Sequence, residues 1–112
     1  MIPLKIDFDK IQETRLPEFK RGEGVMVARM FADESVKIIK GYLEPGSSIG
    51  MHTHEGSSET MFFLSGEGKA IVDDAEEILK PGSCSYCEVG HRHSVINTGK
   101  KKLEFYAVVS LK

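Results

Sequence analysis

The chain has 112 residues, of which 40% are hydrophobic and 29% are charged, and its formal net charge at pH 7 is -2. These values are typical of one globular domain and exclude both a disordered chain and a miniature fold that depends on disulfides. Nucleic acid is excluded as a partner, because such binding rests on clustered lysine and arginine and the only basic block is Lys100-Lys101-Lys102. That block follows a turn signal, Thr98-Gly99, and we interpret it as a solvated turn.

The N-terminal arm, residues 1–24, opens with apolar residues that alternate with polar ones: Ile2, Leu4, Ile6 and Phe8. This alternation predicts a strand, and it lacks the continuous apolar region of a signal peptide. No stretch of the chain approaches the ~18 apolar residues of a membrane span, so we expect a soluble, cytoplasmic protein with no membrane partner. The rest of the arm, from Lys10 to Gly24, is less regular and contains Pro17, which favours a loop or one helical turn.

Short segments rich in Val, Ile, Phe and Tyr follow, separated by Gly, Pro and Asp: 25–31, 35–43, 60–66, 69–74, 76–82, 84–90 and 103–111. Each has the length of a strand, and no long stretch keeps an apolar period of 3.6 residues. Many short strands with regular turn signals predict an all-β sandwich or barrel.

The two cysteines, Cys84 and Cys87, lie in the predicted strand SCSYCE. In extended backbone their Cα atoms would be roughly 10 Å apart and their side chains on opposite faces, which excludes a disulfide between them. We interpret them as free structural thiols. A redox or zinc role is the alternative, although a single CxxC without a second pair is a weak signal.

The histidines have a more specific pattern. His52 and His54 would project from one face of a strand, about 7 Å apart along the chain, which is within chelating reach. Glu59 can join them if residues 55–58 form a turn and the following strand pairs back as a hairpin. Either His91 or His93 could then complete a His3Glu ligand set. The alternative is that these are ordinary surface or hydrogen-bonded histidines, since HxH pairs also occur by chance.

The wider spacing resembles the two motifs of the cupin superfamily. The first motif is matched at every signature position: Gly46, His52, His54, Glu59 and Gly66. The second is matched at Gly82, Gly90, His93 and Asn97, with one departure, since Glu88 stands where the family usually has proline. The two motifs, 46–66 and 82–97, lie within residues 46–97, a region that is nearly half of the chain.

The resemblance implies an all-β double-stranded β-helix, the cupin jelly-roll barrel, with residues 1–112 as a single cupin domain. It also implies that one divalent transition metal (Mn, Fe, Co, Ni or Zn) is held by His52, His54, Glu59 and His93. His91 has no counterpart in the motif and is expected to lie in a loop or beside the ligands. Side chains that share a face with the ligands, namely Met61, Phe63 and Val95, are expected to face inward.

Three functions are compatible with such a site. The first is binding of a small polar or anionic organic molecule at the metal with turnover, as a metal-dependent dioxygenase or isomerase; Tyr86, His91 and Glu88 are candidates for an additional base. The second is a binding protein for a sugar or carboxylate without turnover, and the third is a metal that only stabilises the barrel. Because fold does not name a reaction, these stay open.

Small cupins that resemble this chain commonly form homodimers by adding an N-terminal strand to the partner's sheet. The alternating residues of the arm would suit that arrangement, since an edge strand offers unpaired backbone groups. The simpler interpretation is that the arm pairs within its own barrel.

Overall fold

The computed structural model describes residues 4–111, which form ten β-strands and two 3₁₀ turns. The 3₁₀ turns are η1 (Phe8–Lys10) and η2 (Phe19–Arg21). The strands are β1 (Thr14–Pro17), β2 (Val25–Ala32), β3 (Val36–Leu43), β4 (Ser48–Thr53), β5 (Ser57–Ser65), β6 (Gly68–Val72), β7 (Ala75–Leu79), β8 (Cys84–Cys87), β9 (Arg92–Asn97) and β10 (Leu103–Leu111). In this part of the chain, no helix has the length and apolar character needed to cross a membrane.

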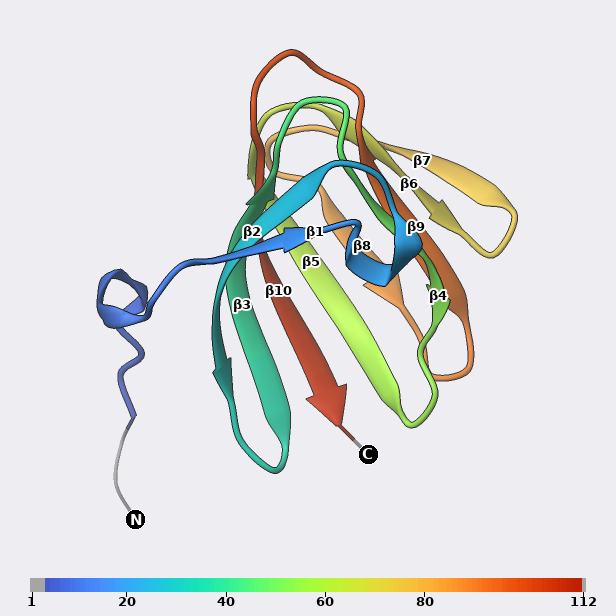
Figure 1. Cartoon of the computed structure of the whole chain (residues 1–112). Helices are drawn as coiled ribbons and strands as arrows, with labels where there is room; N and C mark the ends of the chain where they lie inside the picture. The colour runs from blue at the N-terminus through green and yellow to red at the C-terminus, as the bar shows by residue number, and fades with distance from the viewer. Residues whose placement is uncertain (1–3, 112) are drawn as a thin grey trace.

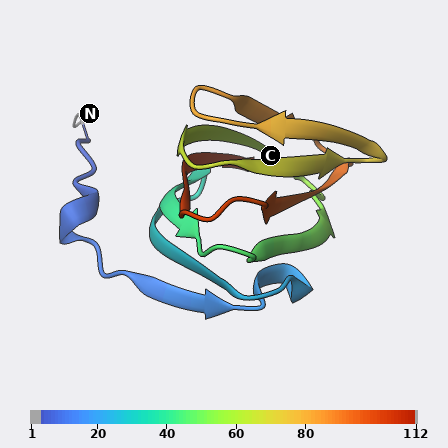
Figure 2. The ribbon, with the colours of Figure 1, turned by 90° about the horizontal axis from the view of Figure 1, so that it is seen from above.

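The strands form two antiparallel sheets that face each other (Figure 1). A six-stranded sheet has the order β1-β2-β3-β10-β5-β8, and a four-stranded sheet has the order β4-β9-β6-β7. Seen from above, the strands curve around a common interior (Figure 2). The predicted all-β architecture is therefore confirmed, and each strand-length segment of the sequence coincides with one strand of the barrel.

Side chains at alternate positions of the strands point inward and fill that interior. In β10 the residues at every second position are buried, and the largest buried side chains, Phe63 and Phe105, have their ring centroids 6.1 Å apart. Met61, Phe63 and Val95 are each at most 2% exposed, so their predicted inward orientation is confirmed. Burying each aromatic or aliphatic side chain of this kind contributes about 1.5–3 kcal/mol to stability.

The predicted N-terminal strand is wrong for the residues that the structure describes; Ile2 lies outside them. Residues 4–7 are irregular and Phe8 begins η1, and this segment belongs to neither sheet. Instead the Phe8 ring packs on Tyr106, and Arg29 donates hydrogen bonds to the carbonyls of Phe8 and Ile11. Alternation here reflects packing of single side chains on the outside of the barrel.

A strand does form later in the arm, in the segment expected to be a loop or one helical turn. Thr14–Pro17 pairs with β2 in the same barrel, with Pro17 as the last residue of this edge strand. That position tolerates proline because an edge strand has one side without ladder hydrogen bonds. The proposed exchange of an arm between two chains involves residues 1–8 and a second chain, and it stays a prediction.

The segment after β1 is pressed against β4. Glu18, Lys20 and Arg21 have φ values of 51°, 55° and 64°, in the left-handed region that residues other than glycine rarely adopt. The turn is held by close backbone contact: a Cβ atom on Gly50 of β4 would lie 2.0 Å from the Lys20 carbonyl oxygen. Only glycine at position 50 permits this approach, so β4 fixes the turn at η2.

The cysteines occupy opposite faces of β8, as expected. Cys84 is exposed, Cys87 is buried, and both are free thiols. Burial, with the nearby carboxylates of Glu59, Asp73 and Glu88, raises the pKa of Cys87 to about 11. Its thiol therefore stays protonated at neutral pH and is unreactive, because the thiolate is the nucleophilic form.

Candidate metal centre

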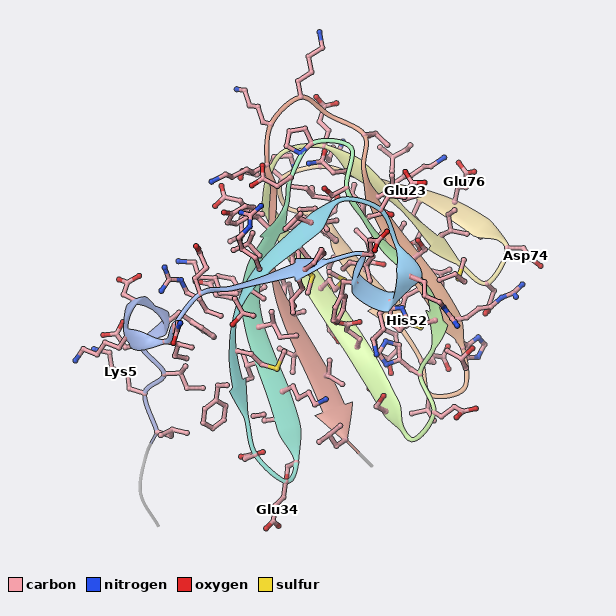
Figure 3. The ribbon with its side chains drawn as sticks, viewed as in Figure 1. Lys5, Glu23, Glu34, His52, Asp74 and Glu76 are labelled. Atoms are coloured by element: carbon pink, nitrogen blue, oxygen red, sulfur yellow. The ribbon has the colours of Figure 1, made fainter. Side chains whose placement is uncertain are left out.

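The structure brings the four predicted ligands together between the two sheets. His52 is on β4, His54 follows the end of that strand, and His93 lies opposite His52 on β9. Glu59 reaches the same point from β5 in the other sheet, so the expected hairpin of β4 and β5 is wrong. One donor atom of each residue lies within 4.8 Å of the others. Figure 3 shows His52 among the side chains between β5 and β4, whereas Glu34 projects away from the barrel.

A β-bulge turns His52 inward. Ile49 pairs with Val95 and His52 pairs with His93, so two residues, Gly50 and Met51, stand opposite Ser94 alone. Side chains alternate between the two faces of a strand, so one extra residue in β4 reverses the face to which each later side chain of that strand points. Ile49 therefore packs in the core while Met51 is exposed and His52 faces the interior.

The donor atoms converge on a single point. His54 Nε2 lies 3.0 Å from His93 Nε2 and 3.1 Å from Glu59 Oε1, and His93 Nε2 lies 2.9 Å from the same Oε1. Two donors bound about 2.1 Å from one ion at right angles to each other are about 3.0 Å apart. The residues present therefore fit a bound transition-metal ion, with histidine and carboxylate as the donors such ions prefer. Their role as ligands stays a prediction.

Hydrogen bonds at the far side of two rings fix which nitrogen faces the centre. His52 Nδ1 donates to the Gly50 carbonyl over 2.7 Å, which leaves Nε2 as the unprotonated nitrogen of a neutral ring. His54 Nδ1 lies 2.9 Å from the Ser57 hydroxyl oxygen. Such partners orient metal-binding imidazoles and select their tautomer. Neither Gly50 nor Ser57 was singled out from the sequence for this role; their closeness to the HxH pair was the available signal.

The surroundings set the charges of the cluster. Burial alone would raise the pKa of Glu59, but hydrogen bonds and charge interactions with His54 and His93 outweigh it and lower that pKa to about 2. Burial lowers the pKa of His52, and the neighbouring imidazoles lower it further against the hydrogen bond to Gly50. At neutral pH the cluster therefore offers an ionised carboxylate and a neutral His52 ring, the forms that bind metal.

Other sequence candidates lie outside the cluster. His91 is exposed, and its Nδ1 lies 2.7 Å from an Asp73 carboxylate oxygen, which raises the pKa of the imidazole. Tyr86 is 54% exposed and does not line the cavity beside the cluster. Glu88 is exposed, and its carbonyl accepts a hydrogen bond from the His91 N–H, so the turn closes without the family's proline. None of these three side chains lines the described cavity, and a role for any of them as a base stays a prediction.

A cavity of about 370 Å³ opens beside the cluster, lined by His52, His54 and Glu59. Much of its wall is apolar: Phe19, Met26, Met30, Ile39, Ile49, Phe105, Val109 and Leu111. The charged side chains on the wall, besides Glu59, are Lys20, Lys37 and Glu55. The sequence did not single out these three. The volume is in the range that small-molecule sites occupy.

We expect metal-loaded protein to release its ion as the pH falls below about 6.5, because protons compete for the imidazole nitrogens. His52, with its lowered pKa, protonates below the usual value of 6.5, and Glu59 stays ionised down to about pH 2. Histidine protonation, and not that of Glu59, therefore drives release above pH 4.5. Equilibrium dialysis between pH 8 and 4.5 followed by elemental analysis measures it. Metal content that is the same at pH 5 and pH 8 would contradict histidine coordination.

Comparison with known proteins gives consistent results. A family model described as "Cupin domain" matches residues 41–109. The oxalate-binding protein of Thermotoga maritima is 34% identical over 109 residues, which cover 91% of this chain and 89% of that protein. The crystal structure of a predicted oxalate decarboxylase from Thermotoga maritima has a TM-score of 0.90 at 29% identity, covering 97% of this chain and 100% of the other. The cupin domain of Cnp3 from Schizosaccharomyces pombe has a TM-score of 0.79 at 13% identity, covers 97% of this chain and 74% of the other, and supports the fold alone.

Proposed function

Because this chain belongs to the cupin family, we propose that it binds one divalent transition metal through His52, His54, Glu59 and His93 and, at that metal, a small organic carboxylate. The observation that carries the proposal is the convergence of four donor atoms within 4.8 Å beside a cavity of about 370 Å³. The similarity to an oxalate-binding protein supports a carboxylate as the ligand. Mn, Fe, Co, Ni and Zn all suit a site of histidine and carboxylate donors.

The chain's own residues would prepare such a site. Gly50 and Ser57 hold two imidazoles with their Nε2 atoms toward the centre, so little reorganisation is needed on binding. The apolar wall, including Ile49 and Phe105, keeps water away from one side of the cavity and strengthens electrostatic attraction within it. The metal would supply a Lewis acid to which a carboxylate oxygen binds.

Turnover is a second candidate, favoured by the position of Glu55. Glu55 lines the cavity, follows His54 in the chain and is not one of the four ligands, so its exposed side chain would be available as an acid or base. The similar structure of a predicted oxalate decarboxylase is consistent with this possibility. A metal-dependent dioxygenase or isomerase would use the same open site. A metal that only stabilises the barrel would need neither the cavity nor Glu55, so these two features favour ligand binding or turnover over a purely structural metal.

Titration calorimetry with oxalate tests the proposal. We expect saturable binding to metal-loaded protein, no binding after the metal is stripped with a chelator, and recovery after reloading. Equal binding before and after stripping would contradict a metal-mediated site. Following the bound carboxylate by NMR over hours then separates the two candidates, since its disappearance indicates an enzyme and its persistence a binding protein.

A further inference from the structure

Two charged residues stand on the inner face of the six-stranded sheet among apolar ones. The inner positions of β2, β3, β10 and β5 carry mainly buried apolar residues: Met26, Ala28, Ile39, Leu43, Leu103, Phe105, Ala107, Met61 and Phe63. In these four strands, all within the described residues, Lys37 and Glu59 are the only charged residues at inner positions. Both line the cavity beside the metal cluster. Glu59 is buried, whereas Lys37 is exposed near the β2–β3 turn, where its charged head can stay in solvent while its stem lies along the apolar wall.

Lys37 and Glu59 lie in one row across the sheet. Lys37 is opposite Val109 on β10, and Val109 is opposite Glu59 on β5. Adjacent strands are about 4.8 Å apart, so the Cα atoms of Lys37 and Glu59 are separated by roughly 10 Å. The flexible four-carbon stem of lysine can carry its ammonium across Val109 toward a molecule bound at the cluster.

No carboxylate of residues 4–111 neutralises this ammonium. The ion pairs of lysine and arginine in that part of the chain involve Arg29, Lys69 and Arg92. Near Lys37 the cavity wall is apolar, with Met30, Ile39 and Val109, and the other charged groups on the wall are Lys20 and Glu55 besides the ligand Glu59. An unpaired cation at the rim of an anion-binding cavity attracts a second negative charge.

We propose that Lys37 is a specificity-determining residue, selecting dicarboxylates that bind the metal through one carboxylate and Lys37 through the other. The inference rests on the proposed function and narrows its ligand class. The carboxyl carbons of oxalate are directly bonded, about 1.5 Å apart, so oxalate cannot extend from the cluster along the row. A dicarboxylate with two or more carbons between its carboxyl groups can do so.

Succinate and butyrate have the same number of carbons and differ in one carboxylate, so their ratio of dissociation constants isolates the second charge. With metal-loaded protein we expect succinate to bind about tenfold more tightly than butyrate, as for one hydrogen bond to a charged group. Lys37→Gln should reduce that ratio to about one, with butyrate affinity and metal content unchanged. Lys37→Arg, which keeps the charge, should retain the preference.

Lys40→Gln is the matched control, since Lys40 is on the same strand but pairs with Tyr106 in a row that faces outward. It should keep the wild-type ratio, and so should Lys20→Gln on the other side of the cavity. A tenfold ratio that persists in Lys37→Gln, or that is lost in either control instead, would overturn the assignment. Equal binding of butyrate and succinate by the wild type overturns it while leaving the proposed function standing. If metal-loaded protein binds oxalate but neither of these acids, the assignment of Lys37 alone fails; if it binds none of the three, both proposals fail.

Discussion

His93→Ala is expected to reduce the metal content of the purified protein from about one ion per chain to less than about a tenth of that. His93 is 2% exposed, and its Nε2 lies within 3.0 Å of both His54 Nε2 and Glu59 Oε1, so the variant loses the central donor. It also removes a hydrogen-bond partner from the buried Glu59 carboxylate, which adds a stability cost of about 3 kcal/mol. Elemental analysis of protein purified without an affinity tag or chelator measures the ion, and thermal unfolding measures the stability.

His91→Ala is the matched control for this variant. His91 is two residues away in the same HRH sequence, but it is exposed and interacts with Asp73. We expect His91→Ala to keep its metal. Full metal content in His93→Ala would refute the assignment of the cluster, and an equal loss in both variants would point to the turn before β9 as the cause.

Gly50→Ala is expected to destabilise the fold by about 3 kcal/mol and to lower the melting temperature by more than about 10 °C. The new Cβ would lie 2.0 Å from the Lys20 carbonyl oxygen and 2.7 Å from the Gly22 backbone nitrogen. Both are backbone atoms of the segment pressed on β4, so no side-chain rotation relieves the contact. Displacement of that segment would also move the Gly50 carbonyl that orients His52, so metal affinity should fall together with stability. Thermal unfolding with and without metal measures both effects.

Gly46→Ala separates crowding from backbone strain. Gly46 has a φ of +77° and no atom within 4 Å of a built Cβ, so the substitution costs only the strain of a left-handed residue, about 1 kcal/mol. If the two variants lose equal stability, the close approach of η2 to β4 has no special importance.

Sequence alone was sufficient for seven of the strands (β2, β3, β5, β6, β7, β8 and β10) and for the four residues of the cluster, because both depend on local spacing. Alternating apolar residues in 103–111 indicate a strand with one buried face. The HxH pair followed by Glu59 indicates a metal site from its local spacing, without reference to other segments of the chain. The resemblance of both motifs to the cupin family added the choice of His93 over His91. The structure places His93, not His91, among the donors.

What the sequence could not show depends on neighbouring strands. The alternation of Ile6 and Phe8 looks like a strand, but a strand also needs a partner, and the partner of β2 is Thr14–Pro17. The bulge at Gly50 and Met51 is visible only in the register with β9. Lys37 was missed for a similar reason. It precedes two adjacent apolar residues, Ile38 and Ile39, so the sequence does not show which of them points inward; the register with β10 shows it.

The ligands of the candidate centre come from both layers of the barrel. His52 and His93 belong to the four-stranded sheet and Glu59 to the six-stranded one, while His54 and His93 are 39 residues apart in the chain. An ion bound by all of them would be a cross-link that closes a long loop, as a disulfide does in small secreted domains. Both cysteines are free, and such a link would form and break by mass action with no redox chemistry. At a free ion concentration a thousand times the dissociation constant it would add about 4 kcal/mol, so the stability of the folded chain would depend on how much metal its surroundings supply.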